Sequence, residues 1–128
     1  MRVETEALSK PNSRFVEMLS TAVPELEFPP DFDHYELAYV VYEDVLIPHL
    51  ARLLVDPDTH EKEIARIMQL VEAIAELGDE DAIDFVMVAV CEAIMHMPHN
   101  LRDQANSRIG PRTSALMERA KAEFGLPE

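Results

Sequence analysis

The sequence has little cysteine, little glycine and no long uncharged apolar run. Its 128 residues include one cysteine, Cys91, so no disulfide can form within one chain. Three glycines and few alternating β-branched residues disfavour a sheet-rich fold. No stretch reaches the roughly 18 apolar residues of a membrane-crossing helix, and residues 1–10 lack the hydrophobic region of a signal peptide. We therefore expect a soluble, cytoplasmic protein without a membrane partner.

Basic residues are also scarce. The chain has 11 Lys and Arg against 25 Asp and Glu, a formal net charge of −14. Binding to nucleic acid requires positive charge to displace counterions, so we do not expect it. No Lys or Arg lies between Arg14 and Arg52 or between Arg66 and Arg102, and the acidic residues of these intervals form two acidic tracts. Such tracts either keep a protein soluble or steer a basic partner into contact.

The most apolar part of the chain is the stretch 79–98. Between Ala82 and Met97 only three polar residues interrupt it: Asp84, Glu92 and His96. Asp79 is a good helix-capping residue and Pro98 ends the stretch. A helix that is apolar nearly all round must be covered by neighbours on most sides. We predict a central helix over Asp79–Met97, in which Cys91 is a small buried hydrophobe.

The remaining segments also favour helix, and 48% hydrophobic residues are enough for a core. We predict one domain over residues 1–128, with 1–10 as a tail. The expected helices run from about Pro11 to Val23, from Asp31 or Asp33 through Asp44, from Pro48 to Val55, from Asp58 or Thr59 to Leu77, from Asn100 to Ser107, and from Pro111 to Phe124. With the central helix, this is an all-α bundle of six to seven helices, or a stack similar to HEAT or armadillo repeats.

Some residues are expected to have structural roles. Pro48 should break the chain into two helices, since proline disfavours the α conformation of the residue before it. Glu92 and His96 are one turn apart in the most apolar helix, so we expect the Glu92 carboxylate to be paired with a tyrosine hydroxyl, a backbone amide or His96. The predicted buried polar or structural residues are Pro48, His49, Gly78, Asp79, Glu92, His96, Gly110 and Pro111.

Aromatic residues recur at helical spacing in the first acidic tract, at Phe32, Tyr35, Tyr39 and Tyr42. Such a stripe forms either a core face or, with its acidic neighbours, a hot spot for a basic protein, and both apply if the rings are buried and the hydroxyls exposed. The predicted partner-binding residues are Asp31, Asp33, Tyr35, Glu36, Tyr39, Tyr42, Glu43, Asp44, Glu72, Glu76, Glu80 and Asp84.

Paired carboxylates also raise an enzymatic alternative. Glu72, Glu76, Asp81 and Asp84 could lie near one another across two helices and bind magnesium, as in all-helical nucleotide pyrophosphohydrolases. The spacing here is Glu-x-x-x-Glu rather than Glu-x-x-Glu, and no basic residue is nearby for a phosphate. We therefore predict no catalysis, no metal site and no cofactor, and keep this enzyme as an alternative.

The segment Leu46–Pro111 resembles a family of small bacterial all-helical domains. The similarity lies in IPHLARLLV, ELGDEDAIDFV, VAVCEAI and IGPR, in this order. The resemblance implies that the family's recurring residues correspond here to Pro48, His49, Gly78, Asp79, Glu92, Gly110 and Pro111. Domains of this kind are similar to immunity proteins, small acidic proteins that block a bacterial toxin by binding to it. The resemblance implies an immunity or antitoxin-type inhibitor of a basic toxin, such as a nuclease; a helical scaffold or regulatory subunit is the alternative.

Overall fold

The computed structural model describes residues 13–26 and 38–125, and in these it contains helices and no strands. The elements are α2 (Ser13–Ala22), α3 (Ala38–Val41), η1 (Tyr42–Leu46), α4 (Ile47–Leu54), α5 (Glu61–Leu77), α6 (Glu80–Phe85), η2 (Val86–Cys91), α7 (Glu92–Met95), α8 (His99–Asn106) and α9 (Pro111–Phe124). Since η1 and η2 are π-helical turns within longer helices, the described residues form six continuous helices. The all-α class predicted from the sequence is confirmed.

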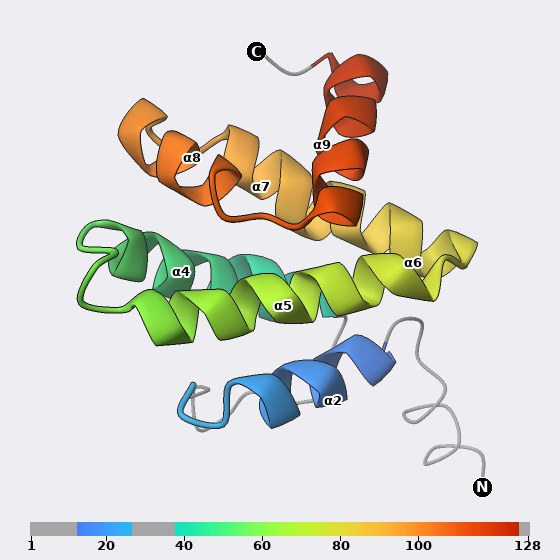
Figure 1. Cartoon of the computed structure of the whole chain (residues 1–128). Coiled ribbons are helices and arrows are strands. Elements are labelled where there is room, and N and C mark those ends of the chain that lie inside the picture. Colours follow the sequence, from blue (N-terminus) through green and yellow to red (C-terminus); the bar gives the residue numbers. More distant parts are fainter. Residues whose placement is uncertain (1–12, 27–37, 126–128) are drawn as a thin grey trace, which may run out of the picture.

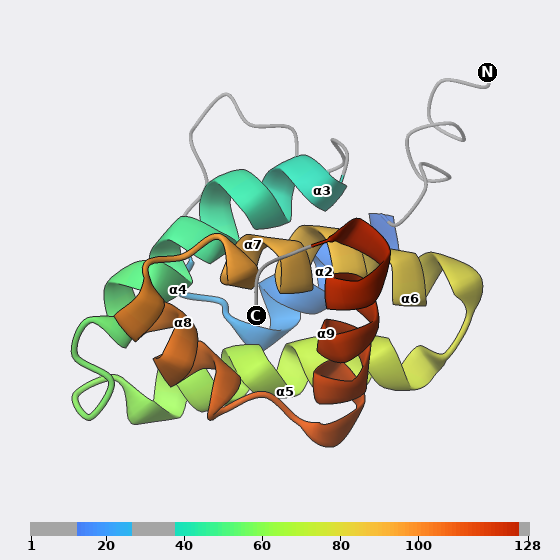
Figure 2. The same cartoon turned by 90° about the horizontal axis from the view of Figure 1, so that it is seen from above.

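The helices pack in layers around the two longest pieces of chain. Helix 38–54, which comprises α3, η1 and α4, lies behind α5 in the view of Figure 1, and only its last part, α4, packs directly on α5. Seen from above, helix 80–95, which comprises α6, η2 and α7, lies between these two, with α2 beneath (Figure 2). α9 crosses from α5 to η2 and packs mainly on η2. Helix 80–95 therefore contacts α5, η1 and α9.

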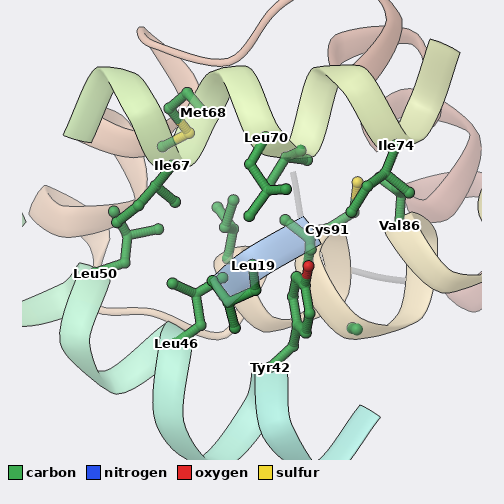
Figure 3. Close-up of a cluster of buried hydrophobic side chains, with 14 of the residues drawn as sticks. Leu19, Tyr42, Leu46, Leu50, Ile67, Met68, Leu70, Ile74, Val86 and Cys91 are labelled. Carbon is green, nitrogen blue, oxygen red and sulfur yellow. The ribbon is translucent and has the colours of Figure 1, made fainter. Parts of the chain in front are cut away.

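The core lies where these helices converge (Figure 3). Leu46 and Leu50 face Ile67 on α5, and Leu19 comes from α2. Helix 80–95 adds apolar side chains that are fully buried, among them Phe85, Val86, Cys91 and Ile94. Burying a large apolar side chain contributes about 1.5–3 kcal/mol, so this cluster is the main source of stability. Burial raises the pKa of Cys91 to about 12, in agreement with its predicted role as a buried hydrophobe.

Several helix ends were predicted correctly. Gly78 ends α5 with a left-handed φ of 77°, which glycine adopts without steric cost. Asp79 caps α6, since its carboxylate accepts a hydrogen bond from the Ala82 amide at 2.9 Å. Two other predicted helix starts, at Asp58 or Thr59 and at Asn100, are wrong. α5 starts after His60, while Thr59 bonds the Asp56 carboxylate, and α8 starts at His99.

The predicted break at Pro48 is also wrong. Ile47 keeps helical angles, φ −63° and ψ −44°, and the helix continues through the proline. Just before it, the helix widens into η1, where the Ile47 amide bonds the Tyr42 carbonyl five residues back. A proline ring clashes with the carbonyl four residues earlier, and a wider turn relieves this clash. Pro48 itself is exposed rather than buried.

The bounds of α9 agree with the prediction. Its buried face is not the one that the spacing of the sequence favours, which runs through Ala115, Leu116, Arg119 and Ala122. The structure instead buries Thr113, Met117 and Ala120. The reason is that small apolar residues occur all round this helix, so hydrophobicity alone does not fix which side faces the core.

Candidate functional site

An acidic pocket forms where the two π-helical turns pack against each other. It has a volume of 380 Å³ and is lined by Glu43 of η1, Val88 of η2, and Glu92, Ala93 and His96. Glu43 is exposed, while Val88 and Glu92 are half-buried. π-helical turns often occur at functional sites because they re-aim side chains relative to a regular α-helix. Here two such turns bring glutamates of different helices to one pocket.

The described residues that line the pocket make it negatively charged. Partial burial, with the neighbouring carboxylates of Asp44 and Glu92, raises the pKa of Glu43 above its ordinary value. No Lys or Arg is among the described residues that line it. Like charges held close together favour a cation between them. The arrangement is therefore suited to an ammonium or guanidinium group.

His96 presents one ring nitrogen to solvent beside these carboxylates. Its Nδ1 lies 2.9 Å from the Glu92 carbonyl oxygen, and since a carbonyl only accepts hydrogen bonds, Nδ1 is the protonated nitrogen. Nε2 of the neutral ring is then an acceptor. The side chain of His96 is exposed. Two carboxylates and the His96 ring therefore line the pocket.

The aromatic stripe divides between the core and its edge. Tyr42 is fully buried and its hydroxyl donates to the Phe15 carbonyl oxygen at 2.7 Å, so its assignment to a partner-binding surface is wrong. Burial also raises the pKa of Tyr42. Tyr39 is half-buried with its ring edge-on to Phe85, at 5.1 Å between centroids. The predicted site residues Asp31, Asp33, Tyr35 and Glu36 lie outside the described residues.

Glu72 is the clearest correction in the second acidic tract. It was predicted to bind a partner, but its carboxylate holds the N-terminus of α9. Oε2 accepts the Arg112 amide at 2.9 Å, and Oε1 accepts the Thr113 amide at 3.0 Å and the Thr113 hydroxyl at 2.9 Å. Partial burial by itself would raise the pKa of Glu72, but these hydrogen bonds outweigh it and lower the pKa. The carboxylate is already engaged within the fold.

The other members of the second tract lie apart from the acidic pocket. Glu76, Glu80 and Asp84 are exposed, and none of them lines it. Because Glu72 is bound to α9, the magnesium arrangement of Glu72, Glu76, Asp81 and Asp84 is not assembled. Among residues 13–26 and 38–125, no three His, Cys, Asp or Glu side chains form a group that could hold a metal ion.

Two of the expected buried polar residues are more exposed than predicted. His96 is exposed, and Glu92 is half-buried at the pocket with no hydrogen bond to its carboxylate from the part of the chain that the structure describes. The predicted pairing of Glu92 with a hydroxyl, an amide or the His96 ring is therefore wrong for the described residues. Only the Glu92 backbone carbonyl bonds His96. Helix 80–95 turns this side away from the core.

Other structural residues are engaged as expected. His49 is half-buried, and its Nε2 lies 2.6 Å from the Glu63 carboxylate on α5. Gly110 and Pro111 open α9 as its N-cap and first residue. Glu63 was missed by sequence reasoning, because it lies 14 residues from His49 on a different helix and no local pattern joins the two.

A second concave surface, also missed, lies between α2 and α5. This apolar groove, of 670 Å³, is lined by Met18, Ala22, Leu70 and Ala73, with Arg14 and Arg66 among its polar residues. Arg14 bonds Asp79 at 2.7 Å, and Arg66 pairs with Glu25. The Arg66 hydrogen bonds lower the pKa of Glu25 to about 2. The basic groups of this groove are therefore already neutralised.

No family model matches the chain, and neither a curated protein nor a solved structure is significantly similar to it. Within the described ranges, none of the helices has the length and apolar character needed to cross a membrane.

Proposed function

We propose that this chain is a non-catalytic, acidic protein-binding domain that inhibits a basic partner, such as a nuclease toxin, in the manner of an immunity protein or antitoxin. The observation that supports the proposal is the pocket that Glu43 and Glu92 share, where none of the described lining residues is Lys or Arg. The proposed place of action is the cytoplasm, and the proposed partner is a protein rather than nucleic acid or a membrane.

Charge supports this proposal at two scales. The net charge of −14 would draw a basic partner over a long range and raise the association rate. At short range, a lysine or arginine side chain of the partner would enter the acidic pocket. There it would replace the repulsion between carboxylates by attraction and hydrogen bonds. Removing that pairing would mainly raise the dissociation rate.

Affinity capture from the native cell lysate, at rising salt, tests this function. The wild-type protein is expected to retain a protein with a strongly basic domain that elutes as salt rises. The double variant Glu43→Lys/Glu92→Lys should lose it. A control, Asp58→Lys/Glu118→Lys, changes the net charge equally at exposed positions outside the pocket and should retain it. If both variants lose the partner equally, binding depends on the net charge and not on the pocket. If the wild type retains no basic partner, the proposed function is wrong.

The apolar groove between α2 and α5 favours the second candidate, a helical scaffold or regulatory subunit. Its lining is largely apolar and its arginines are already paired, so a partner there would bind by burial rather than by charge. Retention of that partner would resist high salt. Met18→Glu, on the groove, should abolish capture in that case, whereas Glu43→Lys/Glu92→Lys should not.

A further inference from the structure

α9 buries fewer and smaller side chains than α5. It buries only Thr113, Met117 and Ala120, whereas α5 buries seven side chains, most of them large. Its ion pairs Arg119–Glu123 and Lys121–Glu118 lie within the helix itself. They stabilise α9 as a helix but do not attach it to its neighbours.

The polar attachment of α9 converges on one side chain. The Glu72 carboxylate, on the middle of α5, accepts both backbone amides and the hydroxyl that the first turn of α9 offers it. These amides have no partner inside a helix, and a carboxylate at this end is also favoured by the helix dipole. Glu72 thus caps α9 from another helix, 40 residues earlier in the chain.

Gly110 makes room for this cap. A Cβ at this position would lie 2.4 Å from Glu72 Oε1 and 2.5 Å from its Cδ, which no side chain tolerates without movement. The backbone of Gly110 is extended, with φ −80° and ψ 177°, so alanine would fit the conformation itself. The requirement for glycine here comes from the close approach of Glu72 and not from the turn.

Beside this cap, the side chains do not fill the space between α9 and its neighbours. A groove of 510 Å³ runs between α9, α5 and α6, lined by Ala75, Ile83 and Leu116 among others. α9 also stands across helix 80–95 rather than along it (Figure 1). Because this groove is open, part of the contact between α9 and its neighbours faces solvent, as is typical of segments that open locally.

We infer that α9 is a releasable unit, which undocks from η2 and α5 while the other helices stay folded, and that the Glu72 carboxylate is the latch that holds it. Release uncovers the side of η2 beneath α9. Because η2 also carries one wall of the acidic pocket, the docked helix supports the geometry of that pocket from behind. The change is local, because the Glu72 carboxylate alone controls whether α9 is docked or released.

Native-state hydrogen exchange by NMR, at low urea concentrations, tests the release. The buried amides of α9 are expected to share one opening reaction, with a smaller dependence on urea than the amides of α5. A smaller dependence means that less surface is exposed than in global unfolding. If the α9 amides instead share both the free energy and the urea dependence of α5, α9 opens only with the whole protein and the inference is wrong.

Two variants one turn apart test the latch. Glu72→Gln replaces one acceptor by an amide that faces the Arg112 N–H, donor against donor, and removes the charge. We expect it to increase the opening constant of α9 at least tenfold. Glu76→Gln, at an exposed position of the same helix, should leave it within about twofold. Equal behaviour of the two variants would remove Glu72 from this role.

A double-mutant cycle with Gly110 provides a second and independent test. Gly110→Ala should increase the opening of α9 in the wild type, because the new methyl group displaces the Glu72 carboxylate. In a Glu72→Ala background the displaced atoms are absent. There the alanine should no longer destabilise, since it also restricts the unfolded chain. Urea unfolding followed by circular dichroism measures the effect of Gly110→Ala on stability in both backgrounds. It can be used even if α9 is already released in the Glu72→Ala variant. An equal loss of stability in both backgrounds would contradict the contact.

Discussion

Glu72 and Glu92 are both half-buried glutamates on long helices, and their roles are the reverse of what the sequence indicates. The exposed-looking Glu72, in an amphipathic helix, is bound by three donors of α9. The buried-looking Glu92, in the most apolar helix, lines a pocket with another carboxylate. The comparison shows that the neighbours a carboxylate meets decide its role more than the hydrophobicity of the sequence around it.

The physical difference lies in what each carboxylate faces. Glu72 faces the N-terminus of a helix, where amides have no other partner and the dipole favours negative charge. Glu92 faces Glu43, and the described residues that line their shared pocket include no Lys or Arg. One site is therefore electrostatically complete within the fold. Among the described residues the other has no such partner, which is why we place the proposed binding there.

The largest difference is expected between the stabilities of two separate variants, in which either Glu72 or Glu92 is replaced by alanine. Glu72→Ala is expected to lower the free energy of unfolding by about 2–3 kcal/mol, because it removes three charge-assisted hydrogen bonds and leaves the buried Thr113 amide without its acceptor. Glu92→Ala should change it by less than about 0.5 kcal/mol in either direction. Urea unfolding followed by circular dichroism measures both. Similar losses in the two variants would mean that Glu92 also has a partner within the fold.

A smaller effect is expected from the donor side of the Glu72 cap. Thr113→Val keeps the shape of a fully buried side chain but removes the hydroxyl that bonds Oε1. The loss should be about 1 kcal/mol, since the backbone amides still bond the carboxylate. In a Glu72→Ala background the same change should cost much less. Additive losses would show that the hydroxyl acts independently of Glu72.

The smallest effect is a difference in pH dependence between the two regions. The lowered pKa of Glu72 means that its stabilisation is present above the ordinary value of 4.5 and is lost as the pH falls below it. The raised pKa of Glu43 has the opposite sign, so the folded state gains stability as the pH falls from 7 and this carboxyl takes up a proton. Since Glu43 is exposed, we expect only a few tenths of a kcal/mol.

Urea unfolding between pH 3.5 and 7 separates these contributions when the wild type is compared with Glu72→Gln and with Glu43→Gln. The advantage of the wild type over Glu72→Gln should shrink at the acid end of the range. Its disadvantage relative to Glu43→Gln should disappear there. If the two stability differences between wild type and variant changed with pH in the same direction, the opposite electrostatic environments of Glu72 and Glu43 would be contradicted.

The sequence predicted the fold class well because local signals determine it. Helix spacing in α5, the capping residue Asp79 and the left-handed glycines Gly78 and Gly125 act within a few residues of their own position. The strongly apolar stretch correctly indicated helix and burial for Phe85, Val86 and Cys91. Pro48 was misjudged because a π-helical turn absorbs a clash that a regular α-helix could not.

The sites were not predictable in the same way, because each joins residues that are distant in the chain. Glu43 meets Glu92 across two packed π-helical turns, and His49 meets Glu63 across two helices. By itself, the sequence determined that this protein is helical, acidic and able to bury a core, since these properties follow from composition and local spacing. Only the tertiary structure decided which carboxylates are engaged and which face solvent, because that depends on the helix ends and charges that packing brings beside them.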